Sequence, residues 1–363
     1  MENWWQSRKE IRRWEEFDDD DNYPVEEPSC IPKAKRSRDK KGYWDEILQE
    51  QIYPDPRESS WYLLYVKSDR FSTVKKSRKL FRRRFRLPRD EYVGIVNMAR
   101  EEEWFPKEEK PDGTGRLGSP LELLVLGALR YLGRGWTFDD ISESTNISEE
   151  KHRVFLHSFI DIGATIMFDK WVRQPTLMSD VKDTMYEFAE AGFDGAGFST
   201  DATHVIMEKC SSKLRNAHLG GKMPFTARSF NISVNHRRQI LAIAPGCPSR
   251  WNDKTISTPM KDSLYQCDIR LESMRKDVEC TLGILKGRWR ILKCGIRLQA
   301  IQDVDKVWKT CCALHNFLLN VDGLNEVWEG GIQCTEYEGE LGLHDESDMH
   351  TLVRDNEVRV VNN

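Results

Sequence analysis

The chain has 363 residues, of which 39% are hydrophobic, and its 55 Lys and Arg against 59 Asp and Glu give a formal net charge of −4 at pH 7. No run of about eighteen consecutive apolar residues occurs, so the sequence predicts no membrane-spanning helix. The first residues lack the basic-then-apolar order of a secretory signal, and the nine cysteines include no Cys-x-x-Cys pair. Together these features argue against a secreted disulfide framework and indicate reduced thiols inside a cell.

The charge is distributed unevenly along the chain. Residues 321–363 contain eleven Asp or Glu and two Arg, which leaves the other 320 residues with a net charge of +5. Residues 75–90 contain nine Lys or Arg and one Asp. Such a block attracts polyanions by counterion release, and a solvated linker is the alternative interpretation. From this block we expect Arg82, Arg83 and Arg84 to contact nucleic acid.

The two ends of the chain have the composition of tails. Residues 1–60 alternate acidic and basic blocks without a lasting apolar period, and we interpret them as a disordered charged tail. Within this tail, "PKAKRSRDKK" at residues 32–41 is typical of a nuclear-import signal, which predicts a nuclear location. We interpret residues 321–363 as a solvated acidic tail, with a DNA-mimicking segment that masks the basic face as the alternative. Between the tails we expect two domains, over residues 61–175 and 185–320.

The first of these domains has a helical period throughout. "GSPLELLVLGALRYL" predicts a helix with Ser119 as its N-cap, Pro120 at its first position and Glu122 completing a capping box. "TFDDISESTNISEEKHRVF" predicts a short helix, a tight turn and a longer helix that begins after Ser148. The inner face predicted for the longer helix consists of Phe155, Phe159, Ile162 and Ile166. The outline is that of a helix-turn-helix, with an ordinary helical bundle as the alternative.

The second domain begins with a different period. Residues 197–207, "GFSTDATHVIM", are rich in strand-forming types, and residues 228–235 alternate apolar with polar side chains. Residues 239–246 follow a polar turn, so the last two segments predict an antiparallel hairpin. Helices are expected over residues 275–292 and 301–320. Strands followed by helices predict an α/β or α+β layer domain.

The helix expected over residues 275–292 is strongly basic, yet Glu279 lies among its cations. The cations on the same line of the helix surface are Arg275, Lys286 and Arg290. The seam expected to pack inward consists of Val278, Leu282, Leu285, Trp289 and Leu292. A surface salt bridge would account for Glu279 without any function.

Two further carboxylates point to a metal site. Asp201 falls inside a predicted strand, where Asp is disfavoured, and Asp253 follows the hairpin. A strand Asp, a loop Asp and a helix Glu can converge on one edge of a sheet to hold Mg²⁺, with Glu279 as the third ligand. The flanking cations would then bind DNA phosphates. His204 would face away from Asp201, because side chains alternate along a strand.

In chain order, "GFSTDATHVIM", "APGCPSRWND", "RKDVECTLGILKGRWRIL" and "CCALHNFLL" resemble the motifs of the Harbinger-type transposases and the nucleases derived from them, within the DDE endonuclease group. The resemblance extends over about residues 85–320. It identifies Asp201, Asp253 and Glu279 as the catalytic, metal-binding residues, although Ala202 stands where the family has Gly.

The resemblance carries expectations of fold and activity. It implies an α+β chain with a helix-turn-helix-like domain followed by an RNase H-like catalytic domain. It also implies Mg²⁺ or Mn²⁺ as the cofactor, and DNA cleavage and strand transfer as the activity. A Myb-like DNA-binding protein is the implied partner, and a homo-oligomer is left open.

One departure from the family weighs against catalysis. Only 25 residues separate Asp253 from Glu279, whereas the family has a longer stretch with a buried strand ending in a Gly-Asp-x-x-Tyr-like motif. Loss of that strand would leave an unpaired ladder and remove a carboxylate. The competing expectation is therefore a catalytically inactive DNA-binding or scaffolding protein derived from a transposase.

Overall fold

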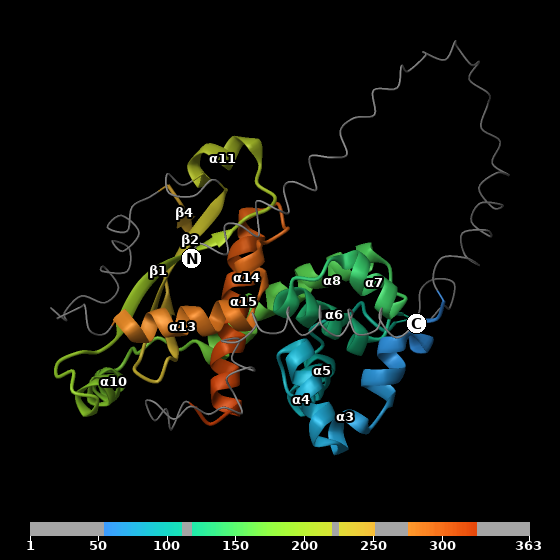
Figure 1. Ribbon diagram of the computed structural model, residues 1–363, viewed down its shortest axis with the longest axis horizontal. Helices are drawn as coiled ribbons and strands as arrows, with labels where there is room; N and C mark the ends of the chain where they lie inside the picture. The colour runs from blue at the N-terminus through green and yellow to red at the C-terminus, as the bar shows by residue number, and fades with distance from the viewer. Residues whose placement is uncertain (1–53, 111–117, 220–224, 251–274, 325–363) are drawn as a thin grey trace, which may run out of the picture. The chain divides into compact units, whose positions relative to one another are not determined.

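The structure of the protein is a computed structural model that describes residues 54–110, 118–219, 225–250 and 275–324 (Figure 1). Helices come first along the chain. They are η1 (Pro56–Glu58), η2 (Tyr62–Lys67), α3 (Arg70–Thr73), α4 (Lys75–Phe85), α5 (Arg89–Glu101), α6 (Leu121–Arg134), α7 (Phe138–Thr145), α8 (Glu149–Ile162), η3 (Gly163–Met167), α9 (Phe168–Trp171) and α10 (Met178–Glu190).

A small sheet and three further helices follow. The strands are β1 (Ser199–Ile206), β2 (Ala227–Val234), β3 (Ile240–Ile243) and β4 (Cys247–Pro248), with α11 (Ser212–His218) between β1 and β2. The helices after the sheet are α13 (Arg275–Arg288), α14 (Ile291–Cys294) and α15 (Ile301–Val321). The mixture of helices and an antiparallel sheet confirms the predicted α+β class, and nothing more specific than that class.

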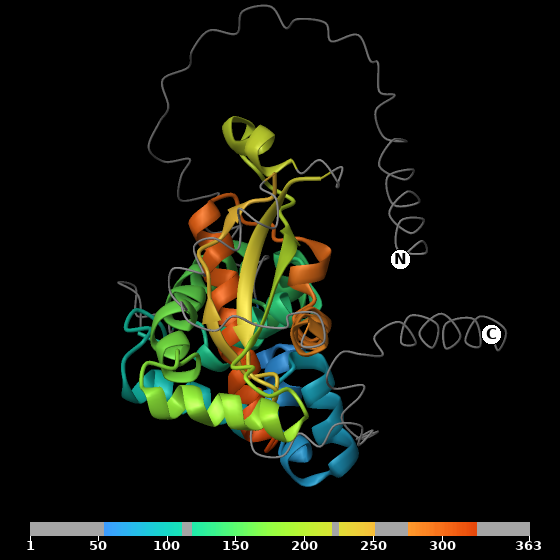
Figure 2. The same ribbon diagram turned by 90° about the vertical axis from the view of Figure 1, so that its left-hand side faces the viewer.

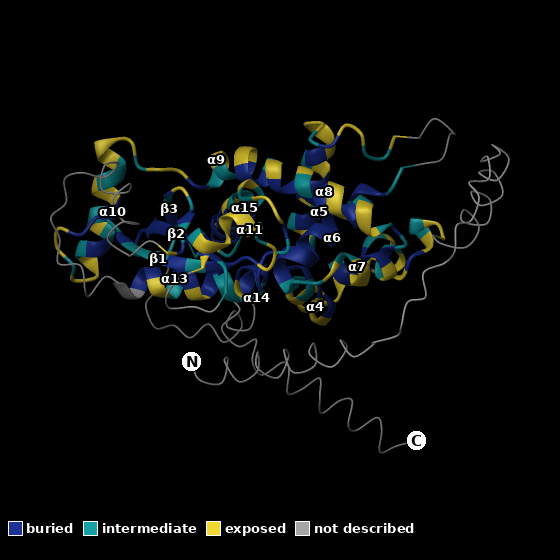
Figure 3. Ribbon diagram, turned by 90° about the horizontal axis from the view of Figure 1, so that it is seen from above, coloured by how far each residue is buried: buried dark blue, intermediate teal, exposed yellow. Residues whose placement is uncertain are grey.

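Helix α6 lies at the centre of the helical part, and Figure 3 shows it in the colour of buried residues. Every residue from Leu121 to Gly133 is buried except Glu122. A Cβ at Gly127 would lie 2.7 Å from Nδ1 of His152, so only glycine admits α8 at this distance. His152 is held there by a 2.8 Å hydrogen bond between its Nε2 and Oγ1 of Thr145. Burial lowers the pKa of His152 to about 4.

The start of α6 differs from the sequence prediction. Pro120 is the N-cap, and no side-chain hydrogen bond caps the helix, so the capping box predicted at Ser119 is wrong. The backbone N–H of Leu121 instead donates to Oε1 of Glu109 at 3.2 Å. The carboxylate of Glu109, from the segment before α6, therefore accepts the N-terminal N–H of the helix that the sequence pattern assigned to the side chain of Ser119.

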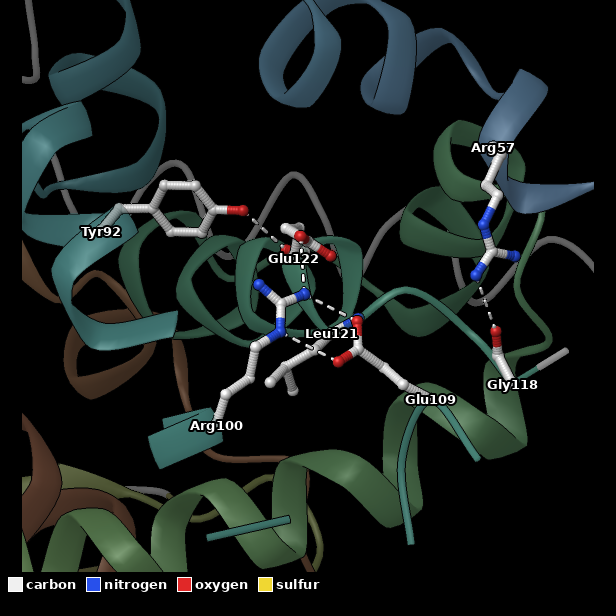
Figure 4. Close-up of polar contacts among 7 residues, drawn as sticks. All are labelled: Arg57, Tyr92, Arg100, Glu109, Gly118, Leu121 and Glu122. Carbon is white, nitrogen blue, oxygen red and sulfur yellow. Dashed lines mark hydrogen bonds and ion pairs between the residues drawn. The ribbon is translucent and has the colours of Figure 1, made fainter. Parts of the chain in front are cut away.

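The same loop carboxylate belongs to a polar cluster, drawn in Figure 4. Arg100 donates to Glu109 and to Glu122, at 2.7 Å in both cases. The Tyr92 hydroxyl donates to the backbone carbonyl of Glu122 at 3.1 Å. The hydrogen bond from Arg100 holds the pKa of Glu109 below its usual range. This cluster joins the end of α5 to the start of α6.

The predicted short helix, turn and longer helix are present as α7 and α8. Thr137 and Asp140 form a capping box at the start of α7, with N–H to side-chain oxygen distances of 3.1 and 3.0 Å. Asn146 ends α7 in the left-handed region at φ 56°, and the side chain of Ser148 accepts from Lys151 N–H as predicted. The two helices and the turn between them are confirmed, whereas a helix-turn-helix arrangement and its use in DNA binding stay predictions.

The inner face predicted for α8 is right at its start and wrong at its end. Phe155 and Phe159 are buried, and Ile162 packs partly against the core. Ile166, however, is 43% exposed. It lies in η3, a π-helical turn that continues α8, and a wider turn rotates the residues that follow relative to an ideal α-helix.

The strands form an antiparallel sheet in the order β1-β2-β3, and β4 also pairs with β2. In the β1–β2 ladder, Asp201 lies opposite Ile232 and Thr203 opposite Phe230. The predicted β2–β3 hairpin is confirmed. Among the described residues, the other edge of β1 carries a single parallel bridge, between Met207 and Ile296.

The long helix α15 covers the sheet. The ring of Trp308 stacks on Phe230 of β2 with centroids 4.7 Å apart. Asn316 accepts the N–H of Ile240 at 2.9 Å and so fixes β3 to the helix. The helix expected over residues 275–292 is interrupted, because α13 ends at Arg288 and α14 begins at Ile291. All five residues of its predicted seam are nevertheless buried.

A buried carboxylate connects α4, α13 and the end of α15. Oδ2 of Asp322 lies 2.6 Å from Arg82 Nη2 and 3.9 Å from Arg288 Nη2. The side chain of Asp322 is 2% exposed and that of Arg288 is 1% exposed. These contacts cross from the helical part to the sheet part, and one large apolar core contains residues of both parts, with a smaller cluster around Phe188 and Ala196. The domain limits proposed from the sequence stay predictions. In the part of the chain that the structure describes, no helix is long and apolar enough to cross a membrane.

Candidate active site

Asp201 is the third residue of β1. Its partner across the ladder, Ile232, is fully buried, whereas Asp201 is partly exposed. Directly opposite residues of an antiparallel pair share a face of the sheet. Asp201 therefore lies at the margin of the face that packs against the core, where a carboxylate can reach solvent.

His204 lies on the opposite face of β1, as predicted. Its Nδ1 is 2.7 Å from the Oγ of Ser229, the residue that it faces on β2. The histidine is thus part of a polar pair within the sheet, on the other side from Asp201.

Glu279 lies in the first turns of α13 and is exposed. The residue before it, Val278, is buried, as is Leu282 one turn later. The apolar seam therefore holds the helix in place and directs Glu279 outward.

Two contacts fix the direction of α13 relative to the sheet (Figure 1). In the turn between β2 and β3, His236 Nδ1 lies 2.9 Å from Oδ2 of Asp277, in the first turn of α13. Toward the other end of α13, Lys286 Nζ donates to the backbone carbonyl of His204 at 2.9 Å. Because the β2–β3 turn adjoins the start of β1, α13 begins near the start of β1 and continues toward its far end.

This direction brings Asp201 and Glu279 to the same end of the β1–α13 pair. Glu279 precedes Lys286 on the same helix face by two turns, which is about 10 Å. Asp201 precedes His204 along the strand by three residues, again about 10 Å. Both displacements lead toward the start of β1.

Lys286 is one of the cations predicted to bind nucleic acid, and part of its hydrogen-bonding capacity is used within the protein. It is partly buried beside β1 and donates to the carbonyl of His204. Burial, with a smaller effect of the Lys293 charge, lowers the pKa of Lys286 to about 8. An ammonium group has three N–H donors, so two remain for other acceptors.

The other residues predicted around Glu279 are described less completely. Asp253 lies outside the described residues. Arg275 begins α13, and only its backbone is described. Arg290 lies between α13 and α14, where its backbone N–H donates to the carbonyl of Gly133 at 3.4 Å and its residue is partly exposed.

The three arginines predicted from the basic block differ in their surroundings. Arg82 is mostly buried in its pair with Asp322. Arg84 donates from Nη1 to the hydroxyl of Tyr65 and lies over the same ring. Arg83 is exposed.

The exposed surface of α4 includes cations that the sequence prediction did not single out. They are Lys75, Lys76, Arg78 and Lys79. The buried residues of α4 are Ser77, Phe81 and Phe85, at the spacing of one helix face. The positions of the two phenylalanines were therefore a usable signal for deciding which cations face solvent.

The carboxylates suit a hard divalent cation in chemical type, because Mg²⁺ and Mn²⁺ prefer carboxylate oxygens. Asp201 and Glu279 are both accessible to solvent and lie at one end of the β1–α13 pair. Within the described residues, no three His, Cys, Asp or Glu side chains gather as a metal site, and Asp253 is not among the residues searched.

Residues 257–316 match the family model of the DDE superfamily endonuclease. The matched segment contains Glu279, Lys286 and Arg290 but neither Asp201 nor Asp253. No curated protein matches the chain, and no solved structure does. The family match supports relationship to the DDE endonuclease superfamily over this segment.

Proposed function

We propose that this protein is a divalent-metal-dependent DNA endonuclease derived from a transposase of the Harbinger type. The observation that carries the proposal is the match to the DDE superfamily endonuclease over residues 257–316, which includes Glu279 and cations beside it. The ordered motifs before this segment, with Asp201 in "GFSTDATHVIM", give further support.

In this proposal Asp201, Asp253 and Glu279 hold Mg²⁺ or Mn²⁺. When bound, the cation supplies Lewis-acid polarisation of the scissile phosphodiester. The chain itself contributes fixed positions for two of the carboxylates. The β1–β2 ladder holds Asp201, and the buried seam of α13 holds Glu279.

The cations beside Glu279 are proposed to bind the DNA backbone. Arg275 and Arg290 would contact phosphates on either side of the cleavage position. Lys286 would contribute one of the two donors that its bond to His204 leaves available. Held in this way, the phosphodiester would lie beside the carboxylates in a geometry suited to attack.

A second DNA-binding surface is proposed on α4. Arg83, Lys75 and Lys76 are exposed and would contact phosphates, whereas Arg82 and Arg84 are less exposed and lie against Asp322 and Tyr65. A Myb-like protein is proposed as the partner that selects the DNA site, and the nucleus as the location.

The proposal is tested by Mg²⁺-dependent nicking of supercoiled plasmid. The wild type is compared with Asp201→Asn and Glu279→Gln, and with Glu101→Gln as a control at an exposed glutamate of α5. We expect the first two variants to lose nicking and the control to retain it. Equal nicking by all four proteins would contradict the proposed carboxylates.

The alternative function is DNA binding or scaffolding without catalysis. The short interval between Asp253 and Glu279 favours it, because its 25 residues show no segment like the family's additional strand. In that case the wild type binds duplex DNA, and its nicking equals the background level of the Asp201→Asn variant.

A further inference from the structure

The connection between β1 and β2 is far longer than a hairpin needs. Antiparallel neighbours are commonly joined by two to five residues. Here residues 207–226 intervene, and they include α11. Figures 1 and 2 show α11 beyond the end of the sheet, away from α10 at the opposite end. We call residues 209–219 the α11 arm.

The base of the α11 arm is anchored firmly to the sheet. His218 is 2% exposed, and its Nδ1 lies 3.0 Å from the carbonyl of Ala227. Ser249 donates to the carbonyl of His218 at 2.5 Å. At the other side of the base, Glu208 is paired with Arg297 at 3.0 Å. The arm is therefore held in a defined position.

The outer part of the α11 arm presents positive charge to solvent. Residues 212–216 are all exposed, and so is Lys209. Lys213 and Arg215 lie on either side of Leu214, which is 39% exposed. The sequence of residues 209–226 contains four Lys or Arg and no Asp or Glu, although acidic residues outnumber basic ones in the chain as a whole.

We propose that the α11 arm binds the phosphate backbone of duplex DNA at a distance from the cleavage position. A cluster of cations within a segment, residues 209–226, that contains no Asp or Glu complements a polyanion. The described arm has no Phe, Tyr or Trp, and His218 is buried, which disfavours base stacking with a single strand. The proposal rests on the proposed function and extends it by defining how much flanking DNA the protein contacts.

The length of β1 sets the distance. Met207, two residues before the α11 arm, lies six positions after Asp201 along the chain, which corresponds to about 20 Å of strand. Duplex DNA rises by about 3.4 Å per base pair, so the arm would contact phosphates about six base pairs or more from the bond at Asp201. Short duplexes centred on that bond would not reach the arm.

The test measures binding of fluorescein-labelled duplexes of 40 and 10 base pairs by anisotropy, in Ca²⁺ and at several KCl concentrations. The wild type is compared with K209A/K213A/R215A and with K107A/K110A/K182A, which removes the same charge from exposed lysines elsewhere. A third variant, K209R/K213R/R215K, keeps the charge. Circular dichroism and thermal unfolding check that each variant folds.

On the 40-base-pair duplex, we expect the arm variant to reduce the slope of log K against log salt by up to about 2.7, since each lost phosphate contact contributes about 0.9. The charge-keeping variant should bind as the wild type does, and the 10-base-pair duplex should show little difference. Equal binding by the arm variant and the lysine control would overturn the proposed DNA contact of the α11 arm and leave the proposed function standing. Absence of duplex binding by the wild type would overturn both the arm and the proposed function.

Discussion

Helices α4 and α13 are both basic, yet they use their cations in different ways. On α4, two phenylalanines define the buried face, and most of the cations project into solvent. On α13, Lys286 turns toward β1, and Arg288 is buried beside Asp322. The position of a cation relative to the apolar seam thus decides whether it contacts the rest of the protein or projects into solvent. Four variants examine this difference and the helix face beside it, in order of their expected effect on the free energy of unfolding.

The largest effect is expected from Asp322→Ala. The substitution leaves Arg82 without its closest charged partner and removes the carboxylate beside the buried guanidinium of Arg288. Breaking a buried pair in this way costs about 3–5 kcal/mol. Asp90→Ala is the matched control, because its pair with Arg78 is exposed and should contribute less than about 1 kcal/mol. Urea unfolding followed by circular dichroism measures both, and similar losses would contradict the assignment.

The next effect concerns Lys286 and depends on pH. Its pKa is about 8 in the folded protein, below the ordinary value of 10.5, so between these values the unfolded chain binds more protons. Wild-type stability should therefore rise with pH in this window relative to Lys286→Met, by about 2 kcal/mol from pH 7.5 to 10. Urea midpoints at several pH values measure the rise. The control Lys75→Met, at an exposed lysine, should show the same rise in stability with pH as the wild type. Parallel curves of stability against pH for the wild type and Lys286→Met would contradict the prediction.

A smaller effect on stability is expected for the double substitution Lys75→Ala and Lys76→Ala on α4. Both side chains are exposed, so the free energy of unfolding should change by less than about 0.5 kcal/mol. Binding to duplex DNA should instead lose salt dependence, with a slope smaller by about 1.8. Anisotropy titrations at about 50 to 200 mM KCl measure this slope. An unchanged slope would remove α4 from the DNA-binding surface.

The smallest effect on unfolding is expected for Glu279→Gln. The side chain is exposed and the substitution keeps its size, so stability should stay within about 0.5 kcal/mol of the wild type. Thermal unfolding measures this, and it separates loss of nicking from loss of folding. A large destabilisation would show that Glu279 has a structural role.

Much of the fold could be predicted from local patterns. The alternation in "RSFNISVN" predicted β2 within a residue, and the seam from Val278 to Leu292 is buried as expected. Local patterns failed where distant residues intervene. The break between α13 and α14 was not predicted, although Gly287 stands just before it, and it lies where Arg290 N–H meets the carbonyl of Gly133 on α6.

The candidate site was predictable in its residue types but not in its arrangement. A strand Asp and a Glu on a basic helix stand out in the sequence. The direction of α13 along β1 depends on contacts made by His236 and Lys286, which are far from their partners in the chain. The inward orientation of Arg82 likewise depends on Asp322, 240 residues away.

The location of Asp322 has a practical consequence for deletion experiments on the acidic C-terminal segment. Although this aspartate belongs to that segment by composition, its carboxylate forms ion pairs with two arginines in the interior. A chain shortened after Val321 would therefore lose interior charge balance together with the segment, and a reduced yield would be mistaken for an effect of the segment itself. Shortening after residue 324 retains the aspartate and allows the remaining acidic residues to be assayed for their own effect on DNA affinity.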